Sequence, residues 1–391
     1  MVTAKIQPAT HRDWKCEFEI DPDNVFLNHA SFGPVTRRGR MAAESLIKRW
    51  GHLTPGLDVD DETFAMLASA KARFARLIGA KDDRIGFAPN TSYGLNAVLW
   101  GLGLTKGERI LLPQIEFPAL VYAVKNIAKK LDLKIEPLPC PKGFLEIETL
   151  EKALSQTSAV LAISYVQYFN GYRYDLKTIT DLCHAKGCFV LVDAIQGVGS
   201  VPLEAEQIGI DALACGAQKW LFGQTGAGFF YISSRPIRAV EPLESGWLSV
   251  DWGYRFEDLK EWNKPGFEDG RRWETGTYPF FSIRFAETGL AVLEECGKQQ
   301  VWAIIQSLLD QLISDLEGTQ YRVAFERGPD HRSGILALTG PRIRELYEHL
   351  KAHKIHTSFR EGTIRVSPHF HNTVEEIARL VERIRQFEGN E

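Results

Sequence analysis

The most informative stretch of the chain is Val190-Leu191-Val192-Asp193-Ala194-Ile195-Gln196. Its apolar, β-branched start has the length of a strand, and the strand ends on an acid. In an open α/β sheet, ligands gather at the carboxyl ends of the strands, so we expect Asp193 to face a site. A second stretch follows, Ala214-Cys215-Gly216-Ala217-Gln218-Lys219-Trp220, and places Lys219 in a loop.

An acid at a strand end and a later lysine are the pair that pyridoxal phosphate (PLP) chemistry requires. The Lys219 amine can form a Schiff base with the PLP aldehyde. The Asp193 carboxylate can keep the pyridine nitrogen protonated, so that the ring accepts electrons. Either residue alone is weak evidence, because most strand-end aspartates cap a helix and most lysines are solvated. Their order and context together favour a PLP site.

These two stretches resemble motifs of the class V aminotransferase family of fold-type I PLP enzymes. That family includes cysteine desulfurases, selenocysteine lyases, C–S lyases, kynureninases and the isopenicillin N epimerase group. The shared pattern is Val-Asp-Ala-x-Gln, then Gly-Ala-Gln-Lys-Trp-Leu, and the resemblance runs from Phe26 to Ser367. It implies PLP as the cofactor, an α/β large domain with a mainly parallel sheet of the seven-stranded type, and a smaller α+β C-terminal domain. We expect the large domain at residues 25–281 and the small domain at 282–391, with residues 1–24 packed nearby.

The composition is that of an ordinary globular protein, with 391 residues, 44% hydrophobic and 25% charged. This length favours two domains. The net charge of −4 gives no basic face for nucleic acid, and no apolar run approaches the ~20 residues of a membrane helix. The six cysteines form no Cys-x-x-Cys pair and are predicted to be buried free thiols. With no signal-peptide pattern, we expect a cytoplasmic enzyme without a metal site and without nucleic-acid or membrane partners.

A phosphate cradle is expected where Pro89-Asn90-Thr91-Ser92-Tyr93-Gly94 leads into an apolar-faced helix. Asn or Thr here is also an ordinary N-cap, but the free N–H groups of a helix start bind phosphate as well. The resemblance places the PLP phosphate on Thr91 and Ser92 and implies a further donor in Gln218. Thr277 resembles the threonine that reaches the PLP phosphate of the neighbouring subunit, which implies a homodimer with shared sites.

Two residues are expected beside the PLP ring. Phe117 follows the strand at 109–112, where the family carries the ring that stacks on the cofactor. Desulfurases usually have a histidine there; phenylalanine offers the flat π face but cannot act as an acid or base. The resemblance also implies that Gln196 hydrogen-bonds the ring hydroxyl.

The substrate is expected at Arg365, where the family has its arginine for the substrate α-carboxylate. A guanidinium offers a planar fork that matches a carboxylate. Asn28 and Ser31 belong to an N-terminal segment that lies across the site mouth in the family, although turn and cap chemistry explains them equally well. Three polar residues after the strand at 159–164 are further candidates between which the sequence does not choose: Gln167, Tyr168 and Asn170.

The expected reaction starts when Lys219 removes the α-proton of a small amino acid. We expect a class V aminotransferase-type activity, with a C–S lyase or an epimerase as alternatives. A PLP-holding protein without turnover and a nicotinamide-dependent oxidoreductase are less favoured, the latter because no Gly-x-Gly-x-x-Gly follows an early strand. The stretch His356–Thr363 holds no cysteine, so sulfur transfer through a protein thiol is not expected.

Strands alternate with helices as far as residue 232, which predicts a mainly parallel sheet. The segment 241–281 has little regular pattern and is expected to be functional or to pack on a partner. One helical stretch is expected from Ser282 to about Leu316, followed by a βαβ-like part. In that last part, strands are expected at 321–326, 334–338, near 355–358 and 363–366, and helices at 341–352 and 373–387, with a Thr373–Glu376 capping box.

Overall fold

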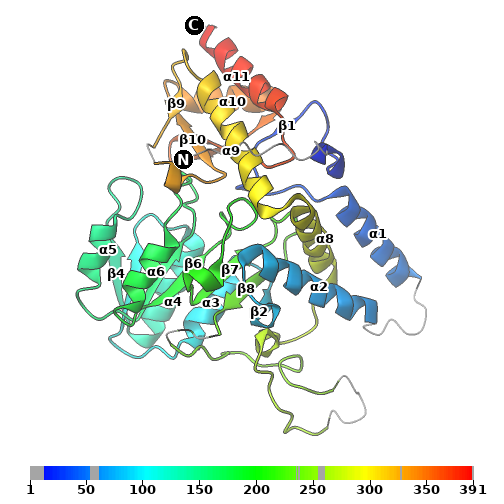
Figure 1. Ribbon diagram of the computed structural model, residues 1–391, viewed down its shortest axis with the longest axis vertical. Helices are drawn as coiled ribbons and strands as arrows, with labels where there is room; N and C mark the ends of the chain where they lie inside the picture. The colour runs from blue at the N-terminus through cyan, green and yellow to red at the C-terminus, as the bar shows by residue number, and fades with distance from the viewer. Residues whose placement is uncertain are drawn as a thin grey trace, which may run out of the picture.

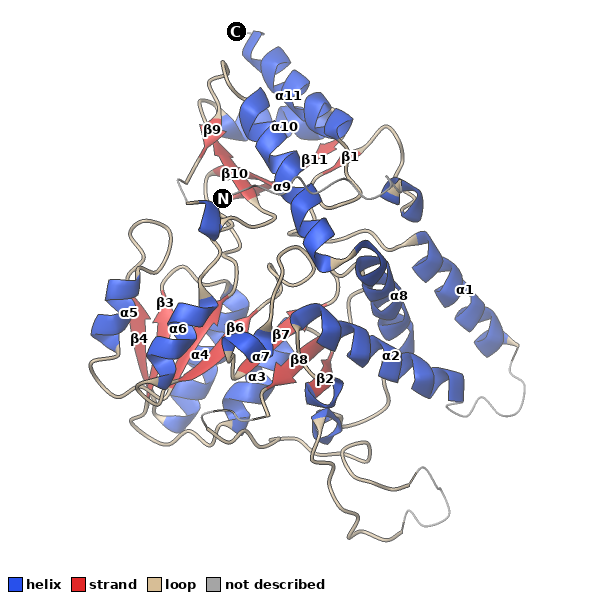
Figure 2. Ribbon diagram, in the orientation of Figure 1, coloured by secondary structure: helices blue, strands red, loops and turns tan. Residues whose placement is uncertain are grey.

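The computed structural model describes residues 13–52, 61–234, 236, 238–253, 260–325 and 328–389. Figures 1 and 2 show a larger part built around a central sheet and a smaller part that carries the C-terminus. Within these residues, no helix combines the length and apolar composition needed to span a membrane. The domain boundary near residue 281 stays a prediction.

The central sheet has seven strands in the order β2-β8-β7-β6-β5-β3-β4. The pairs from β4 to β7 are all parallel, and β8 is antiparallel to both of its neighbours. This confirms the expected mainly parallel α/β sheet. The strands are β2 (Ile85–Ala88), β3 (Arg109–Pro113), β4 (Lys134–Leu138), β5 (Val160–Ser164), β6 (Phe189–Asp193), β7 (Ala212–Gly216) and β8 (Gly228–Ile232).

Helices cover both faces of this sheet, which is why its central strands β5, β6 and β7 are buried at every position and are apolar up to their last residue. On β6, Phe189 and Leu191 pack into one apolar core with α3 and α4, while Val190 and Val192 pack into a second core on the other face. The register pairs Ser164 with Asp193, so these two residues end their strands side by side. The helices are α2 (Asp61–Ile78), α3 (Thr91–Gly101), α4 (Pro118–Leu131), α5 (Ile147–Ala153), α6 (Leu176–His184) and α7 (Ala205–Ile208).

The expected single helical stretch from Ser282 to about Leu316 is wrong. The structure has two helices, α8 (Phe280–Cys296) and α9 (Lys298–Asp315). Gly297 separates them with a φ of 86°, a left-handed conformation that glycine adopts without strain and that ends the first helix.

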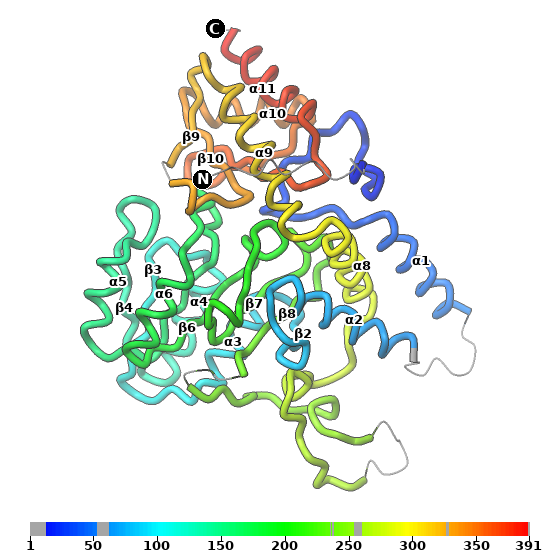
Figure 3. Tube along the Cα trace, in the orientation of Figure 1, coloured from blue at the N-terminus to red at the C-terminus, as the bar shows by residue number. Residues whose placement is uncertain are grey.

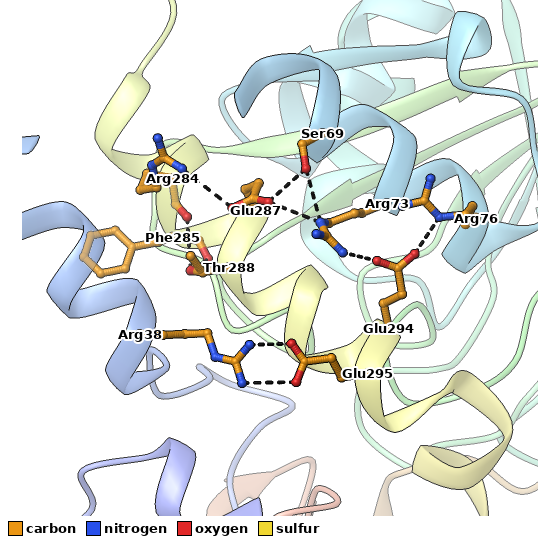
Figure 4. Close-up of polar contacts among 10 residues, drawn as sticks. All are labelled: Arg38, Ser69, Arg73, Arg76, Arg284, Phe285, Glu287, Thr288, Glu294 and Glu295. Atoms are coloured by element: carbon orange, nitrogen blue, oxygen red, sulfur yellow. Dashed lines mark hydrogen bonds and ion pairs between the residues drawn. The ribbon is translucent and has the colours of Figure 1, made fainter. Parts of the chain in front are cut away.

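Ion pairs join α8 to the helices that lie beside it, α1 (Arg37–Gly51) and α2. Figure 4 shows Arg73 of α2 reaching Glu287 and Glu294 of α8, and Arg38 of α1 reaching Glu295. Exposed pairs of this kind contribute only about 0–1 kcal/mol each. They therefore orient the three helices, while apolar packing supplies most of the attachment.

The C-terminal part contains a four-stranded sheet in the order β12-β13-β10-β9. Its pairs are antiparallel, and because β10 and β12 both pair with β13, these two strands run parallel to each other. The chain between them passes through α10, so the βαβ-like expectation is confirmed, with β13 inserted between the two strands after a tight turn at Glu361 and Gly362. The Thr373–Glu376 capping box is confirmed. The elements are β9 (Arg322–Val323), β10 (Leu336–Thr339), α10 (Ile343–Ala352), β11 (Ile355–His356), β12 (Ser358–Arg360), β13 (Thr363–Val366) and α11 (Val374–Gly389).

The N-terminal segment lies against this C-terminal part, as the tube in Figure 3 shows. β1 (Val25–Phe26) pairs in parallel with β11, and Asn28 then bridges to Ser367. The segment continues to Gly33, whose backbone N–H donates to Gln218 O at 2.8 Å. The first ordered strand of the chain is thereby brought to the lysine loop.

Candidate active site

Asp193 and Lys219 come from neighbouring strand ends, the first from β6 and the second from the loop after β7. Asp193 is buried, and its Oδ1 accepts a hydrogen bond from the Ile195 N–H at 3.1 Å. Burial raises the pKa of Asp193 to about 6 and lowers the pKa of Lys219 to about 8. Each charge acts on the other residue's pKa in the direction of an attractive pair. At neutral pH the acid is therefore mostly ionised, while a fraction of the lysine is an uncharged amine.

A glycine fits the N-terminal segment onto this loop. A Cβ atom on Gly33 would lie 2.1 Å from the backbone oxygen of Lys219, so any side chain here would displace the loop. On the other side, His369 Nε2 donates to Trp220 O at 3.2 Å. The backbone on either side of the lysine is thus held by two segments that are far apart in sequence.

The expected phosphate contacts converge on the end of β7. Thr91, the first residue of α3, accepts a hydrogen bond through Oγ1 from the Gly216 N–H at 2.9 Å. A Cβ on Gly216 would meet Gln218 Oε1 at 2.4 Å and Thr91 Oγ1 at 3.1 Å, so this glycine leaves room for both side chains. Asn90 caps the helix, and Ser92 is exposed in its first turn. The roles of Thr91, Ser92 and Gln218 toward a phosphate stay predictions.

Gln196 is already engaged by the protein. Its Nε2 donates to Ala30 O at 2.9 Å, and its Oε1 accepts from Trp220 Nε1 at 3.0 Å. The side chain therefore ties the N-terminal segment to the residue after Lys219. Its predicted contact with the cofactor ring is untested.

Phe117 presents an open ring beside the lysine. The ring is 40% exposed, and its centroid lies 5.7 Å from Lys219 Nζ. Tyr168 packs edge-on against it, with 5.1 Å between the ring centroids. A planar group attached near Lys219 would find a π face here, which is the arrangement that stacking requires.

The three open candidates after β5 take different places. Gln167 is buried, and its Nε2 donates to Glu116 Oε1 at 2.8 Å. Asn170 holds the backbone at Gly143 O and at the Tyr172 N–H. Tyr168 adjoins both Phe117 and the guanidinium of Arg365, so it is the candidate that reaches the site.

Arg365 is a buried cation. It is 2% exposed and donates to Ser358 Oγ at 3.0 Å, to Tyr168 O at 2.6 Å and to Ser31 Oγ at 2.7 Å. Over the described ranges, no carboxylate forms an ion pair with it. Burial lowers the pKa of Arg365 to about 9, which leaves the group charged at neutral pH. An uncompensated buried charge costs several kcal/mol, so an anionic ligand would be strongly favoured here.

Asn28 and Ser31 lie close together on the N-terminal segment, where the Ser31 N–H donates to Asn28 O at 3.0 Å, and Ser31 contacts the Arg365 guanidinium. Ser31 is one of its hydrogen-bond acceptors. Asn28 Oδ1 is buried and has no hydrogen-bond partner in the part of the chain that the structure describes. A buried polar atom left unsatisfied is costly, which favours a donor supplied by a ligand.

Sequence reasoning missed Glu116 as a buried acid next to the site. Glu116 accepts from the Ser164 N–H at 3.0 Å, from the Ser164 hydroxyl and from Gln167 Nε2 at 2.8 Å. Burial raises its pKa to about 7, and the charge of Asp193 adds to the shift. The signal in the sequence was an acid between Ile115 and Phe117 at a strand end, a position that apolar patterning alone does not interpret.

A second missed feature is a cluster of three buried histidines behind the lysine loop: His29, His369 and His371. His29 Nδ1 donates to Ser367 O at 3.0 Å, which makes its Nε2 the acceptor from His371 Nε2 at 2.9 Å. Burial lowers the pKa of His29 to about 3 and holds those of the other two well below their usual range. The cluster is therefore neutral in the folded protein.

This cluster predicts acid sensitivity. Below about pH 6.5 the unfolded chain protonates these histidines and the folded chain does not, so stability falls as pH falls, by up to about 1.4 kcal/mol per pH unit for each histidine. Asp193 and Glu116 act oppositely, because their raised pKa values make stability fall as pH rises. We expect His29→Asn to flatten the loss of unfolding free energy between about pH 6.5 and pH 4 in urea titrations. His52→Asn, at an exposed position, is the control, and an unchanged slope in His29→Asn would contradict the assignment.

Thr277 lies apart from these residues. It is exposed and lines a cavity of about 280 Å³ together with Pro89 and Tyr93. Its predicted reach into a neighbouring subunit stays a prediction. Its segment, 241–281, carries strongly exposed apolar side chains: Leu243, Trp247 and Trp262.

Three comparisons with known proteins agree with the family resemblance drawn from the sequence. A family model described as Aminotransferase class-V matches residues 57–380. An uncharacterized aminotransferase, YcbU of Bacillus subtilis, is 28% identical over 81% of this chain and 82% of its own length. A probable cysteine desulfurase of Methanothermobacter thermautotrophicus is 24% identical over 94% of this chain and 95% of its own. The apo structure of a cysteine desulfurase from Thermococcus onnurineus superposes with a TM-score of 0.86 at 19% identity, covering 98% of this chain and 100% of that one, which shows a shared fold.

Proposed function

The chain belongs to the class V aminotransferase family and is a PLP-dependent enzyme, and from this premise we propose that it transfers the amino group of a small amino acid. The observation that carries the proposal is that Lys219 and the buried Arg365 occur in one site, where the charge of Arg365 lowers the pKa of Lys219. Arg365 has no ion-pair partner among the described residues. Lys219 can move a proton at the substrate Cα, and Arg365 can hold the α-carboxylate.

The residues present suit PLP. Asp193 offers a buried carboxylate for a pyridinium nitrogen, Phe117 an uncovered aromatic face, and Lys219 a partly neutral amine for covalent attachment. At the other end, the start of α3 and the space over Gly216 between Thr91 and Gln218 suit a phosphate. We propose these residues as the cofactor's contacts.

Proton transfer at Cα is assigned to Lys219. When bound, PLP supplies the electron sink that makes the α-proton removable. Because burial holds the pKa of Lys219 near 8, its Nζ can accept that proton near neutral pH. Nζ would then return the proton to a carbon of the cofactor. Arg365, with Ser31 beside it and Asn28 on the same N-terminal segment, would orient the substrate so that its Cα–H bond points at Nζ.

Transamination is favoured over sulfur transfer by what surrounds Lys219. The β12–β13 hairpin holds no cysteine; Cys16 and Cys296 lie on other elements, and the remaining thiols are buried. Epimerisation would need a second base. The nearby Tyr168 hydroxyl donates to Glu361 at 3.0 Å, and burial with this bond raises its pKa to about 12, so it is a poor base.

A C–S lyase is the second candidate function. β-Elimination needs the same lysine and only a good leaving group on the substrate, with no thiol on the enzyme. Curated relatives named as cysteine desulfurases, at 24–26% identity, are compatible with this reading.

The reaction is tested with two substrate mixtures. With alanine, we expect pyruvate only when a 2-oxo acid is present as acceptor. With cysteine and a reductant, we expect no persulfide on any protein cysteine. Release of pyruvate and sulfide from cysteine without an acceptor would put the lyase first. A protein persulfide found by mass spectrometry would contradict the argument from the hairpin.

We also propose a homodimer. Thr277 is exposed in a segment with exposed apolar side chains, which suits a residue that acts on a partner's site. Sedimentation of the purified protein tests the oligomeric state.

A further inference from the structure

The hairpin that carries Arg365 carries a second arginine on the same face. In the register of β12 and β13, Ser358 is opposite Arg365 and Arg360 is opposite Thr363. Opposite residues of an antiparallel pair share a face, as do residues two apart on one strand. Arg360 therefore projects from the face that bears Arg365.

The opposite face of this hairpin packs on the protein. Phe359 lies against Tyr347, with 5.8 Å between ring centroids, and the guanidinium of Arg344 stacks at 4.0 Å from the Phe359 ring. A two-residue turn, with φ of 44° at Glu361 and 77° at Gly362, closes the hairpin. The backbone at Arg360 is thereby fixed, although its side chain is exposed.

No carboxylate neutralises Arg360 within the described residues. Its Nη1 donates to the backbone oxygen of Phe359 at 2.7 Å. The adjacent acid, Glu361, accepts from the Tyr168 hydroxyl at 3.0 Å instead. The charge of Arg360 lowers the pKa of both Lys219 and Arg365, so it acts on the centre of the site. The substrate side of the site is thus richer in positive charge than one α-carboxylate would need.

We propose that Arg360 binds a second anionic group, and that the substrate is a dicarboxylic amino acid. The inference rests on the proposed function, in which buried Arg365 holds the α-carboxylate. Arg360 stands at the exposed tip of the same face and takes the side-chain carboxylate. Arg360 and Arg365 are diagonal neighbours on one face of an antiparallel pair, which lie about 7–8 Å apart, and a four- or five-carbon diacid can bridge this separation between two guanidinium side chains.

The test measures equilibrium binding to the PLP-loaded enzyme by calorimetry, with pairs of near-isosteric amino acids: aspartate against asparagine, and glutamate against glutamine. In the wild type, we expect at least one acid to bind about tenfold more tightly than its amide. Arg360→Ala and Arg360→Gln should both abolish this preference and leave the affinity for the amide unchanged. Arg344→Ala, which removes a cation from the other face of the hairpin, should keep the preference.

Two outcomes overturn the inference. One is equal binding of acid and amide by the wild type. The other is an equal loss of affinity for the acid and for its amide in the Arg360 variants, because that result would give Arg360 a role at the α-carboxylate. In either case, binding of neutral amino acids that depends on Arg365 would leave the proposed function standing. Failure of every amino acid to bind would overturn both.

Discussion

Replacing Lys219 with alanine is expected to lower turnover at least about a thousandfold, because one side chain supplies both the covalent attachment and the proton transfer at Cα. In the wild type, borohydride reduction followed by peptide mapping should find the pyridoxyl group on Lys219. In Lys219→Ala, the cofactor should be removable by dialysis.

Lys106→Ala, at an exposed surface lysine, is the control and should keep both attachment and activity. Pyridoxyl label on a different lysine of the wild type would refute the assignment of Lys219. Lys219→Arg should be as inactive as the alanine variant, because a guanidinium cannot form the attachment and stays protonated.

Removing the Arg365 guanidinium should weaken amino-acid binding by about 2–5 kcal/mol, or roughly 30-fold to several thousandfold in Kd, while PLP stays bound. The large effect follows from burial, because the α-carboxylate would be the ion-pair partner that none of the described residues provides. Arg365→Lys should recover little, since an ammonium cannot reproduce the three directed contacts with Ser358, Tyr168 and Ser31.

The Kd is measured by calorimetric titration of the PLP-loaded variants with alanine and with other accepted amino acids. Arg344→Ala serves again as the control, because its guanidinium packs on Phe359 away from the site. Unchanged affinity of Arg365→Ala for every accepted amino acid would exclude the carboxylate role.

The large sheet could be predicted from sequence because its strands are buried on both faces. A run such as Val190–Val192 is apolar at every position for that reason, and the acid that ends it, Asp193, marks the edge where sites form. The alternation of strands and helices was predicted to run as far as residue 232, which is where β8 (Gly228–Ile232) ends.

The strand order of the C-terminal part was harder to predict, because it depends on contacts between distant residues. A strand as short as Arg322–Val323 carries little periodic signal, and its partners, Leu338 and Thr339, lie too far along the chain for local patterning to identify. Gly297 looks like a tolerable glycine inside a helical pattern, and only its left-handed φ shows that it ends α8.

In the site, residue types were predictable and neighbours were not. Asp193 and Lys219 could be identified from their residue types and their spacing in the sequence. The contact between Gln167 and Glu116 joins residues 51 positions apart, and the contact between Ser31 and Arg365 joins residues 334 positions apart, so neither has a local signature.

The pairing of β1 with β11 has a consequence for how the protein is made. Val25 finds its partner at Ile355, and Asn28 finds its partner at Ser367, so the segment that seats Gly33 on the lysine loop cannot dock until those late residues exist. During synthesis, the sheet strands up to β8 can assemble from nearer neighbours, while the first strand waits through most of translation. In a nascent or truncated chain that ends before β11, the central sheet would therefore form, but the N-terminal segment with Gly33 would not be docked on the lysine loop.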